Sequence, residues 1–276
     1  MSYTTKIYIF IKKLAVLNHN LLSGNFSNIQ NEKSVPATYL CFVNNKIMIE
    51  NINWEDVSPE LSEKGFLTLK SILLPSQCDE LIALYDEPIY RSTINMARYQ
   101  FGFGEYKYFN YPLPNIVQTL RTVIYPHLAK VANLWMNVLN IDKVFPEKHE
   151  ELLKICHENE QLRPTPLILK YTEGGYNTLH QDLYGDVWFP FQMVIFLNEP
   201  NRDFTGGEFV LVEQRPRMQS VPEVLTPNQG DILIFTTNFR PVKGTKGYYR
   251  TNMRHGVSKV RSGIRHTLGI IFHDAK

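Results

Sequence analysis

Cysteine is scarce in this sequence, and the few that occur form no motif. The 276 residues contain three cysteines, Cys41, Cys78 and Cys156, and none has another cysteine close by in the chain. A disulfide-rich secreted scaffold and a cysteine-ligated zinc module both need more, and more closely spaced, cysteines, so these two classes are excluded. The pattern is typical of a reducing compartment, and we expect a cytoplasmic protein.

Long hydrophobic runs are missing as well, and so is a strong net charge. The apolar run at residues 7–11 is ended by Lys12 and Lys13, so it is too short to span a bilayer and lacks the form of a secretory signal. We therefore expect no association with a membrane. With 29 basic and 27 acidic side chains the net charge is +2, and the overall charge favours no class of partner.

The patterning of the remainder divides the chain into three parts. Residues 1–47 are rich in asparagine and weakly periodic, and we interpret them as an N-terminal extension for which Met48 is an alternative start. Residues 48–160 predict a strand at 65–70 and helices that pack on the core. The helices are expected at 75–84, at 114–139 with an interruption at Pro126, and at 147–158, the last with two surface histidines, His149 and His157.

Residues 161–276 change to short apolar runs separated by Gly, Pro, Asn and Asp. This pattern predicts an antiparallel barrel or sandwich, and hence an α+β protein with a mainly β core. Strands are expected at residues 167–171, 179–183, 191–197, 208–213, 221–225, 231–236, 251–257 and 265–272.

Aromatic residues are concentrated at residues 99–111, where seven of thirteen side chains are Phe or Tyr. The segment contains Gly102 and Gly104, but not the Gly-Lys-Ser/Thr element of a nucleotide-binding P-loop. Two interpretations stay open. In one, the rings pack onto the core. In the other, the segment is a substrate lid, in which the glycines permit motion and the rings stack on a flat substrate such as a nucleobase.

A candidate metal site begins with His180 and Asp182, which lie two residues apart in the strand expected at 179–183. Their side chains therefore point to the same face. A second imidazole, from His255 on a later strand, would complete a set of two histidines and one carboxylate. Such a set binds non-haem Fe(II) and leaves coordination positions open. A histidine in a strand more often packs in the core, so the prediction depends on what accompanies this triplet.

A candidate receptor for a carboxylate accompanies it. Arg265 follows His255 by ten residues, and Arg265 and Thr267 share one face of the last expected strand. A guanidinium beside a hydroxyl binds one end of a dicarboxylate through a bidentate ion pair and a hydrogen bond. Tyr171, on the strand that precedes His180, could add another hydroxyl. We interpret two further histidines as structural, His266 and His273.

Together these residues resemble the Fe(II)/2-oxoglutarate-dependent dioxygenases, which have the same His-X-Asp, distal His and Arg-X-Thr pattern. Segments 203–209 and 229–235 are similar to strand-turn elements of the prolyl hydroxylases, and segment 171–175 is similar to the tyrosine-glycine approach of the AlkB-type nucleic-acid dealkylases. The run from residue 180 to residue 274 resembles a bacterial oxygenase family classed as acting on alkylated DNA. The resemblance covers roughly residues 54–276.

The resemblance implies a double-stranded β-helix, or jelly-roll, barrel as the catalytic core, at residues 161–276, supported by the N-terminal helices. Dioxygen and the cosubstrate 2-oxoglutarate would oxidise a substrate C–H bond, with release of succinate and CO2. The carboxylate of the metal site favours hydroxylation over halogenation, because related halogenases lack it. The residues implied are His180, Asp182 and His255 for Fe(II), and Arg265, Thr267 and Tyr171 for 2-oxoglutarate.

Alkylated single-stranded nucleic acid is the first substrate expected, by oxidative dealkylation in DNA repair. The sequence departs from the dealkylases at Leu169, where they have an asparagine, and at Ile271, where they have a second arginine. A prolyl-type protein hydroxylase and a small-molecule hydroxylase with the same cofactors are therefore alternatives. A cupin-like metal-binding barrel without oxygenase activity is an alternative of another class, but it has no need of the Arg265-X-Thr267 pair.

Charge near the distal histidine adds a hint about the substrate, because no acidic residue lies between Asp231 and Asp274. Several basic residues flank His255, so we expect a basic rim at the mouth of the site, which suits nucleic acid. A solvated basic loop without function is the alternative. Residues 244–249 are expected to form a loop able to order over a substrate. The basic residues are Arg240, Lys243, Lys246, Arg250, Arg254, Lys259, Arg261 and Arg265.

Overall fold

The structure is a computed structural model and describes residues 47–182 and 185–276. Residues 1–46, which hold nearly all of the expected N-terminal extension, lie outside the described residues. The described helices are η1 (Met48–Asn51), α3 (Trp54–Lys64), α4 (Pro75–Ala83), η2 (Leu84–Asp86), η3 (Met96–Tyr99), α5 (Asn115–Val138) and α6 (His149–Glu158).

The described strands fall into an N-terminal and a C-terminal group. The first group is β1 (Phe66–Leu69), β2 (Tyr90–Asn95), β3 (Gly102–Phe103) and β4 (Glu105–Phe109). The second group is β5 (Leu167–Tyr171), β6 (Tyr176–His180), β7 (Phe191–Phe196), β8 (Phe204–Gly206), β9 (Phe209–Gln214), β10 (Val221–Leu225), β11 (Ile232–Thr236), β12 (Phe239–Gly244), β13 (Gly247–Val257), β14 (Val260–Gly263) and β15 (Arg265–Ile271).

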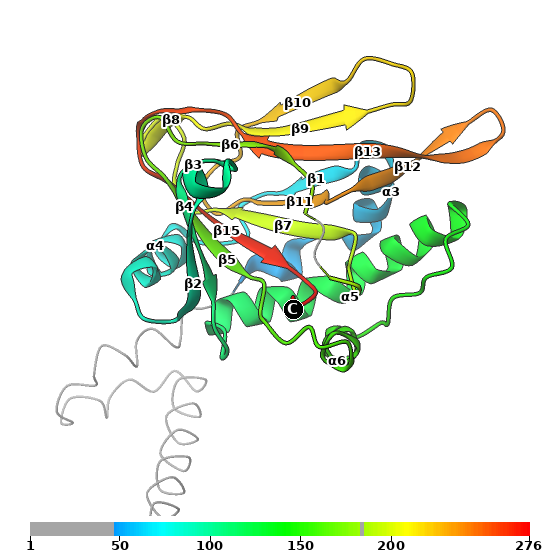
Figure 1. Cartoon of the computed structure of the whole chain (residues 1–276), viewed down its shortest axis with the longest axis horizontal. Helices are drawn as coiled ribbons and strands as arrows, with labels where there is room; N and C mark the ends of the chain where they lie inside the picture. The colour runs from blue at the N-terminus through cyan, green and yellow to red at the C-terminus, as the bar shows by residue number, and fades with distance from the viewer. Residues whose placement is uncertain (1–46, 183–184) are drawn as a thin grey trace, which may run out of the picture. The chain divides into compact units, whose positions relative to one another are not determined.

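Two antiparallel sheets form the core (Figure 1). The larger sheet has seven strands in the order β1-β11-β7-β15-β5-β4-β2, and the second has the order β10-β9-β13-β6-β3, with β12 paired to β13. From β5 to β15 the chain passes back and forth between the two sheets, which is the topology of a jelly roll. The predicted α+β class and jelly-roll fold are confirmed. The two sheets share no strand among the described residues, so the arrangement is a sandwich rather than a closed barrel.

All eight strands expected in the C-terminal part are present. The main difference concerns the strand expected at 179–183, which is β6 and ends at His180, so that Asp182 lies beyond it. Every residue of β7 and β15 is buried, because the larger sheet is covered by helices on one face and by the second sheet on the other. This explains why these strands are continuous apolar runs in the sequence.

The expected interruption at Pro126 is wrong, since α5 is unbroken over Asn115–Val138. The helix buries one face against the larger sheet, where Trp135 contacts Phe191 at a ring distance of 4.7 Å. Pro126 has no N–H to donate to the carbonyl of Thr122. Thr122 is exposed, so water can replace the lost donor. Burial of the opposite face therefore outweighs the loss.

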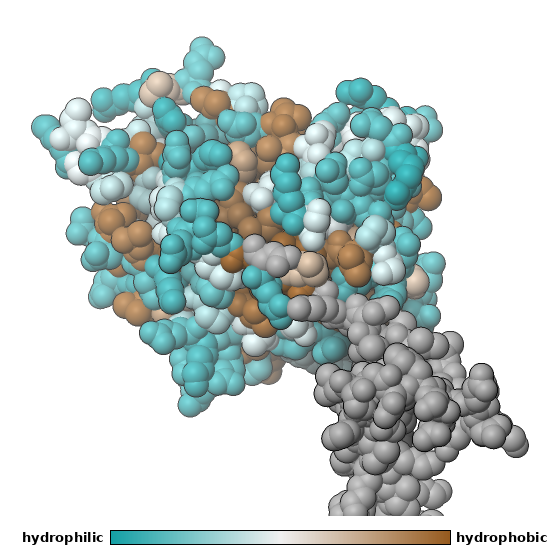
Figure 2. Space-filling model, turned by 180° about the vertical axis from the view of Figure 1, so that it is seen from behind, coloured by the Kyte–Doolittle hydropathy of each residue, from teal (hydrophilic) through white to brown (hydrophobic). Residues whose placement is uncertain are grey.

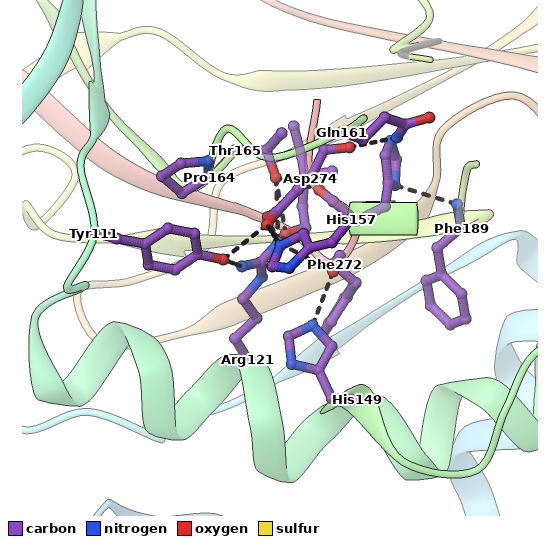
Figure 3. A network of polar contacts seen from close by, with 12 residues as sticks. Tyr111, Arg121, His149, His157, Gln161, Pro164, Thr165, Phe189, Phe272 and Asp274 are labelled. Carbon is purple, nitrogen blue, oxygen red and sulfur yellow. Dashed lines mark hydrogen bonds and ion pairs between the residues drawn. The ribbon is translucent and has the colours of Figure 1, made fainter. Parts of the chain in front are cut away.

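A buried polar network fixes the C-terminal end of the chain to α5 and α6 (Figure 3). The expectation that His149 lies on the surface is wrong, because α6 turns it inward and its Nε2 donates to the carbonyl of Phe272 over 2.8 Å. His157 is partly exposed, as expected, and its Nε2 lies 3.1 Å from the carboxylate of Asp274. Asp274 is fully buried and pairs with Arg121 of α5 at 2.8 Å.

The surface seen in Figure 2 is mainly polar, with apolar side chains gathered toward the middle of that face. No described helix is both long enough and apolar enough to cross a membrane. Three exposed large side chains come from one short segment of the chain, Tyr99, Phe101 and Phe103.

Candidate active site

Three potential metal ligands converge at the end of β6. His180 is the last residue of this strand, and its Cα partner on β13 is His255. Asp182 follows, with carboxylate oxygens 3.5 Å from Nε2 of His180 and 3.3 Å from Nε2 of His255. One potential ligand atom of each residue lies within 4.8 Å of the other two, and the described residues contain no second group of this kind. The group offers two imidazole nitrogens and one carboxylate to a single cation.

Strand geometry explains only part of this convergence. Antiparallel pairing of β6 with β13 puts the two histidines directly opposite each other. Asp182 lies past the strand, so the alternation of side chains does not position it. Its neighbour Gln181 holds this segment in place, because its Nε2 donates to the backbone carbonyls of Asn238 at 2.8 Å and Met253 at 2.9 Å.

Hydrogen bonds fix the side chains of two of the three potential ligands. Nδ1 of His180 donates to the carbonyl of Thr178 at 2.7 Å, so Nε2 keeps its lone pair for a metal. Gln192 reaches the site from β7 in the other sheet, and its Nε2 donates to Oδ2 of Asp182 at 2.8 Å. Sequence reasoning missed Gln192, since no motif surrounds it and only the packing of the two sheets brings it here.

The electrostatics of the cluster favour the protonation states that a metal needs. Burial raises the pKa of the Asp182 carboxyl, but the hydrogen bond and charge of His255, together with His180, lower it more, and the net pKa lies below the usual range. Burial lowers the pKa of His255, and the neighbouring His180 lowers it further. At neutral pH the carboxyl is therefore ionised and His255 is neutral.

A pocket of about 260 Å³ extends from this cluster between the two sheets. Its inner part contains the three residues predicted to bind a dicarboxylate. Tyr171 on β5 is the Cα partner of Arg265 on β15, and Thr267 lies two residues further along β15 on the same face. The structure therefore brings all six predicted site residues to one pocket.

The guanidinium of Arg265 is buried in this pocket without a partner. The residue is 1% exposed, and none of its three nitrogen atoms makes a hydrogen bond within the described residues. Burial lowers its pKa from 12.5 to about 10, so it stays charged at neutral pH. The rings of Phe196 and Tyr171 lie 5.4 and 5.5 Å from the guanidinium carbon and compensate only partly. Because a buried unpaired charge is costly, this end of the pocket suits an anion.

The aromatic segment at residues 99–111 contributes both to the core and to the pocket. Phe109 is fully buried in the core. By contrast, Phe101, Tyr106 and Tyr108 line the outer part of the pocket, the last two in edge-to-face contact at 5.4 Å. The two interpretations of this segment thus apply to different residues. The glycines do not mark a flexible lid, because Gly102 is part of β3, which pairs with β6.

The expected basic rim is wrong for three of its members, one of which is Arg265, buried inside the pocket at 1% exposed. Arg240 is buried and pairs with Glu213 at 3.0 Å. Arg254 is exposed, but alternation along β13 turns it to the face opposite the buried His255. The loop expected at residues 244–249 is the end of the β12–β13 hairpin, which projects from the rest of the described fold (Figure 1).

A model of one oxygenase family matches residues 104–275 of this chain, and the family is described as an oxygenase catalysing oxidative methylation of damaged DNA. Two uncharacterized proteins of Mycobacterium tuberculosis, Rv2227 and MT2286, are each 44% identical to the chain over 164 residues, which is 59% of this chain and 70% of the relative. The family model covers more than half of the chain, and the chain therefore belongs to this oxygenase family. The prediction of an oxidoreductase related to oxygenases of damaged DNA is confirmed.

Solved structures with a similar shape include a Pseudomonas putida prolyl-4-hydroxylase, with a TM-score of 0.48 and 14% identity over 81% of this chain and 99% of that chain. Another is an oxidoreductase of the 2OG-Fe(II) oxygenase family from Burkholderia pseudomallei, with a TM-score of 0.44 and 17% identity over 82% of this chain and 94% of that chain. Both TM-scores are below 0.5, so the assignment depends on the sequence family.

Proposed function

We propose that this oxygenase uses Fe(II), 2-oxoglutarate and dioxygen to oxidise a methyl group on a damaged base of DNA. His180, Asp182 and His255 bind Fe(II), and Arg265, Thr267 and Tyr171 bind the distal carboxylate of 2-oxoglutarate. When bound, Fe(II) would activate dioxygen, which is the oxidant: one oxygen atom would go to 2-oxoglutarate, which is converted to succinate and CO2, and the other would go to the substrate C–H bond. Hydroxylation of an N-methyl group then gives an unstable hydroxymethyl amine, which releases formaldehyde and leaves the unmodified base.

The unpaired guanidinium of Arg265 is the observation that carries this proposal. It lies in the same pocket as the group of two histidines and one carboxylate, and the hydroxyl of Tyr171 is also buried there without a partner. The donor set fits Fe(II), and the unpartnered polar atoms fit a carboxylate group. A metal-binding barrel without a cosubstrate would bury this charge for no gain, which argues against the cupin-like alternative.

The chain's own residues prepare this chemistry. The bond from His180 to Thr178 keeps Nε2 directed at the metal, and the bond from Gln192 restrains one oxygen of Asp182. The ring of Phe209 stacks on His255 at 5.9 Å and shields it from water. The ligands are thus held in position before the metal binds, which reduces the reorganisation needed on binding.

The outer part of the pocket supports a flat and uncharged substrate group. Its lining there combines aromatic rings with the neutral polar side chains of Asn177, Thr178 and Gln181, and the only carboxylate among the described lining residues is that of Asp182. A neutral nucleobase fits such a lining better than a charged peptide side chain, because nothing there would pair with the charge. The family description, which names damaged DNA, agrees with this inference.

The test is substrate-dependent release of succinate and formaldehyde, measured with single-stranded oligonucleotides carrying single methylated bases, and with peptides and metabolites as comparison. We expect release with at least one methylated oligonucleotide, none with its unmethylated twin, and none from the Asp182→Ala variant. Release with peptides alone would contradict the DNA substrate but leave the cofactors intact. Release in the Asp182→Ala variant equal to wild type would contradict the metal site itself.

A further inference from the structure

Four exposed rings come from the segment of η3 and β3 and from the neighbouring strand β6, and one of them, Phe101, lines the active-site pocket. Tyr99, Phe101 and Phe103 are 55%, 46% and 50% exposed, and Tyr176 is 38% exposed. Tyr99 and Phe101 are stacked, with ring centroids 5.6 Å apart and planes inclined by 20°. Phe103 is the Cα partner of Tyr176 on the neighbouring strand. We call these four residues the aromatic shelf.

The backbone of the shelf is held firmly in place. Met96 is fully buried and anchors η3, and its backbone carbonyl accepts a hydrogen bond from the N–H of Phe101 at 3.1 Å. The carbonyl of Phe101 accepts from both the N–H and the hydroxyl of Thr178, each at 2.9 Å. Gly102, with a φ of +140°, approaches β6 so closely that a Cβ would lie 2.2 Å from the carbonyl oxygen of Tyr176. The rings therefore stand exposed on a rigid support, which lowers the entropy lost on binding.

The shelf is continuous with the active site. Phe101 belongs both to the shelf and to the lining of the pocket. Asn177 directly follows the shelf residue Tyr176 on β6, and it lines the pocket together with Thr178 and the metal-ligand candidate His180. A chain that rests on the shelf would thus reach the metal position with one of its units.

The chemistry of the shelf favours single-stranded DNA as its occupant. Parallel exposed rings stack on any base, provided that the base is not already paired and stacked in a duplex. Residues 96–104 contain no acidic side chain, and the exposed Arg98 adds positive charge next to the rings. A phosphate backbone is compatible with this surface, whereas a purely apolar protein contact would leave Arg98 unpaired.

We propose that the aromatic shelf binds single-stranded DNA by stacking on the nucleotides next to the target base, which itself enters the pocket. This proposal rests on the proposed function and specifies that its DNA substrate is single-stranded. It assigns a role to ring side chains that do not touch the metal or 2-oxoglutarate. Three of them, Tyr99, Phe103 and Tyr176, do not line the pocket at all.

Fluorescence anisotropy of an undamaged, labelled single-stranded oligonucleotide tests the shelf without any chemistry. The full chain is used, without Fe(II) or 2-oxoglutarate, so that failure of the proposed oxygenase reaction would not affect the result. We expect Tyr99→Ala and Phe103→Ala each to weaken binding about tenfold, and Phe103→Trp to bind as tightly as wild type. The matched control is Tyr248→Ala, which removes a ring that is 47% exposed on the distant hairpin.

The proposal is overturned if the shelf variants bind like wild type, if Tyr248→Ala loses as much affinity as they do, or if a duplex of the same sequence binds as tightly as the single strand. It is also overturned if sedimentation shows a dimer that Phe103→Ala dissociates, because the shelf would then be covered by a second copy of the chain. Thermal unfolding of each variant verifies that it is folded.

Discussion

Replacing Arg265 by methionine should make the protein more stable but unresponsive to 2-oxoglutarate. Burial lowers the pKa of this guanidinium from 12.5 to about 10. At about 1.4 kcal/mol per pH unit, the buried charge destabilises the ligand-free fold by about 3 kcal/mol at neutral pH. The loss of ring contacts from Phe196 and Tyr171 offsets about 1 kcal/mol of this, so the variant should gain about 2 kcal/mol. For a domain of this size, that gain raises Tm by about 4–8 °C.

The assay is thermal and urea unfolding with and without 2-oxoglutarate and Mn(II), used as a redox-inert substitute for Fe(II). Wild type should gain about 3 kcal/mol at a 2-oxoglutarate concentration one hundred times Kd, whereas Arg265→Met should gain nothing. The matched control is Arg240→Met, because Arg240 is equally buried but pairs with Glu213 at 3.0 and 3.1 Å. This variant should lose about 3 kcal/mol and keep its response. An Arg265→Met protein that is less stable than wild type, or that 2-oxoglutarate still stabilises, refutes the reasoning.

Three further predictions follow from buried polar groups. Stability to urea should fall as the pH is lowered from 6.5 to 4. Three buried histidines have pKa values of about 4 in the folded protein, so the unfolded chain takes up protons at higher pH than the folded one. Unchanged stability over this pH range would contradict the prediction. Gln192→Leu should weaken Fe(II) binding by about tenfold, measured by competition with a chelator, without lowering Tm. Asp274→Ala should cost about 3 kcal/mol of stability, because it leaves the buried Arg121 unpaired, while metal affinity stays that of wild type. The three histidines are His149, His266 and His273.

The fold could be predicted from the sequence because its strands have separate and regular signals. Short apolar runs between turn residues located eight of the eleven described strands from β5 to β15, and two of the eight, β5 and β10, have the expected ends. The strands β8, β12 and β14 were not predicted. The helices were less predictable. Proline at position 126 normally ends a helix, yet burial of α5 against the sheet overrides that preference. His149 is buried for a similar reason, since charged neighbours conceal which side of α6 faces the core.

The candidate site was predictable to the extent that it depends on spacing. The pairs His180 and Asp182, and Arg265 and Thr267, are close in sequence, and strand geometry brings His255 opposite His180. Contacts between the sheets have no such signal. The hydrogen bond from Gln192 to Asp182 joins residues on different sheets, and the ion pair of Arg240 with Glu213 removes a charge that the sequence alone would place at the rim.

The central claim is that one pocket binds Fe(II) and 2-oxoglutarate together. Its most direct test is anaerobic addition of Fe(II) and 2-oxoglutarate to the purified protein, followed by visible absorption spectroscopy. We predict a charge-transfer band that needs both additions, is lost in His255→Ala and Asp182→Ala, and needs far more 2-oxoglutarate in Arg265→Met. Absence of the band in folded wild-type protein, or its persistence in Asp182→Ala and His255→Ala, would contradict the account.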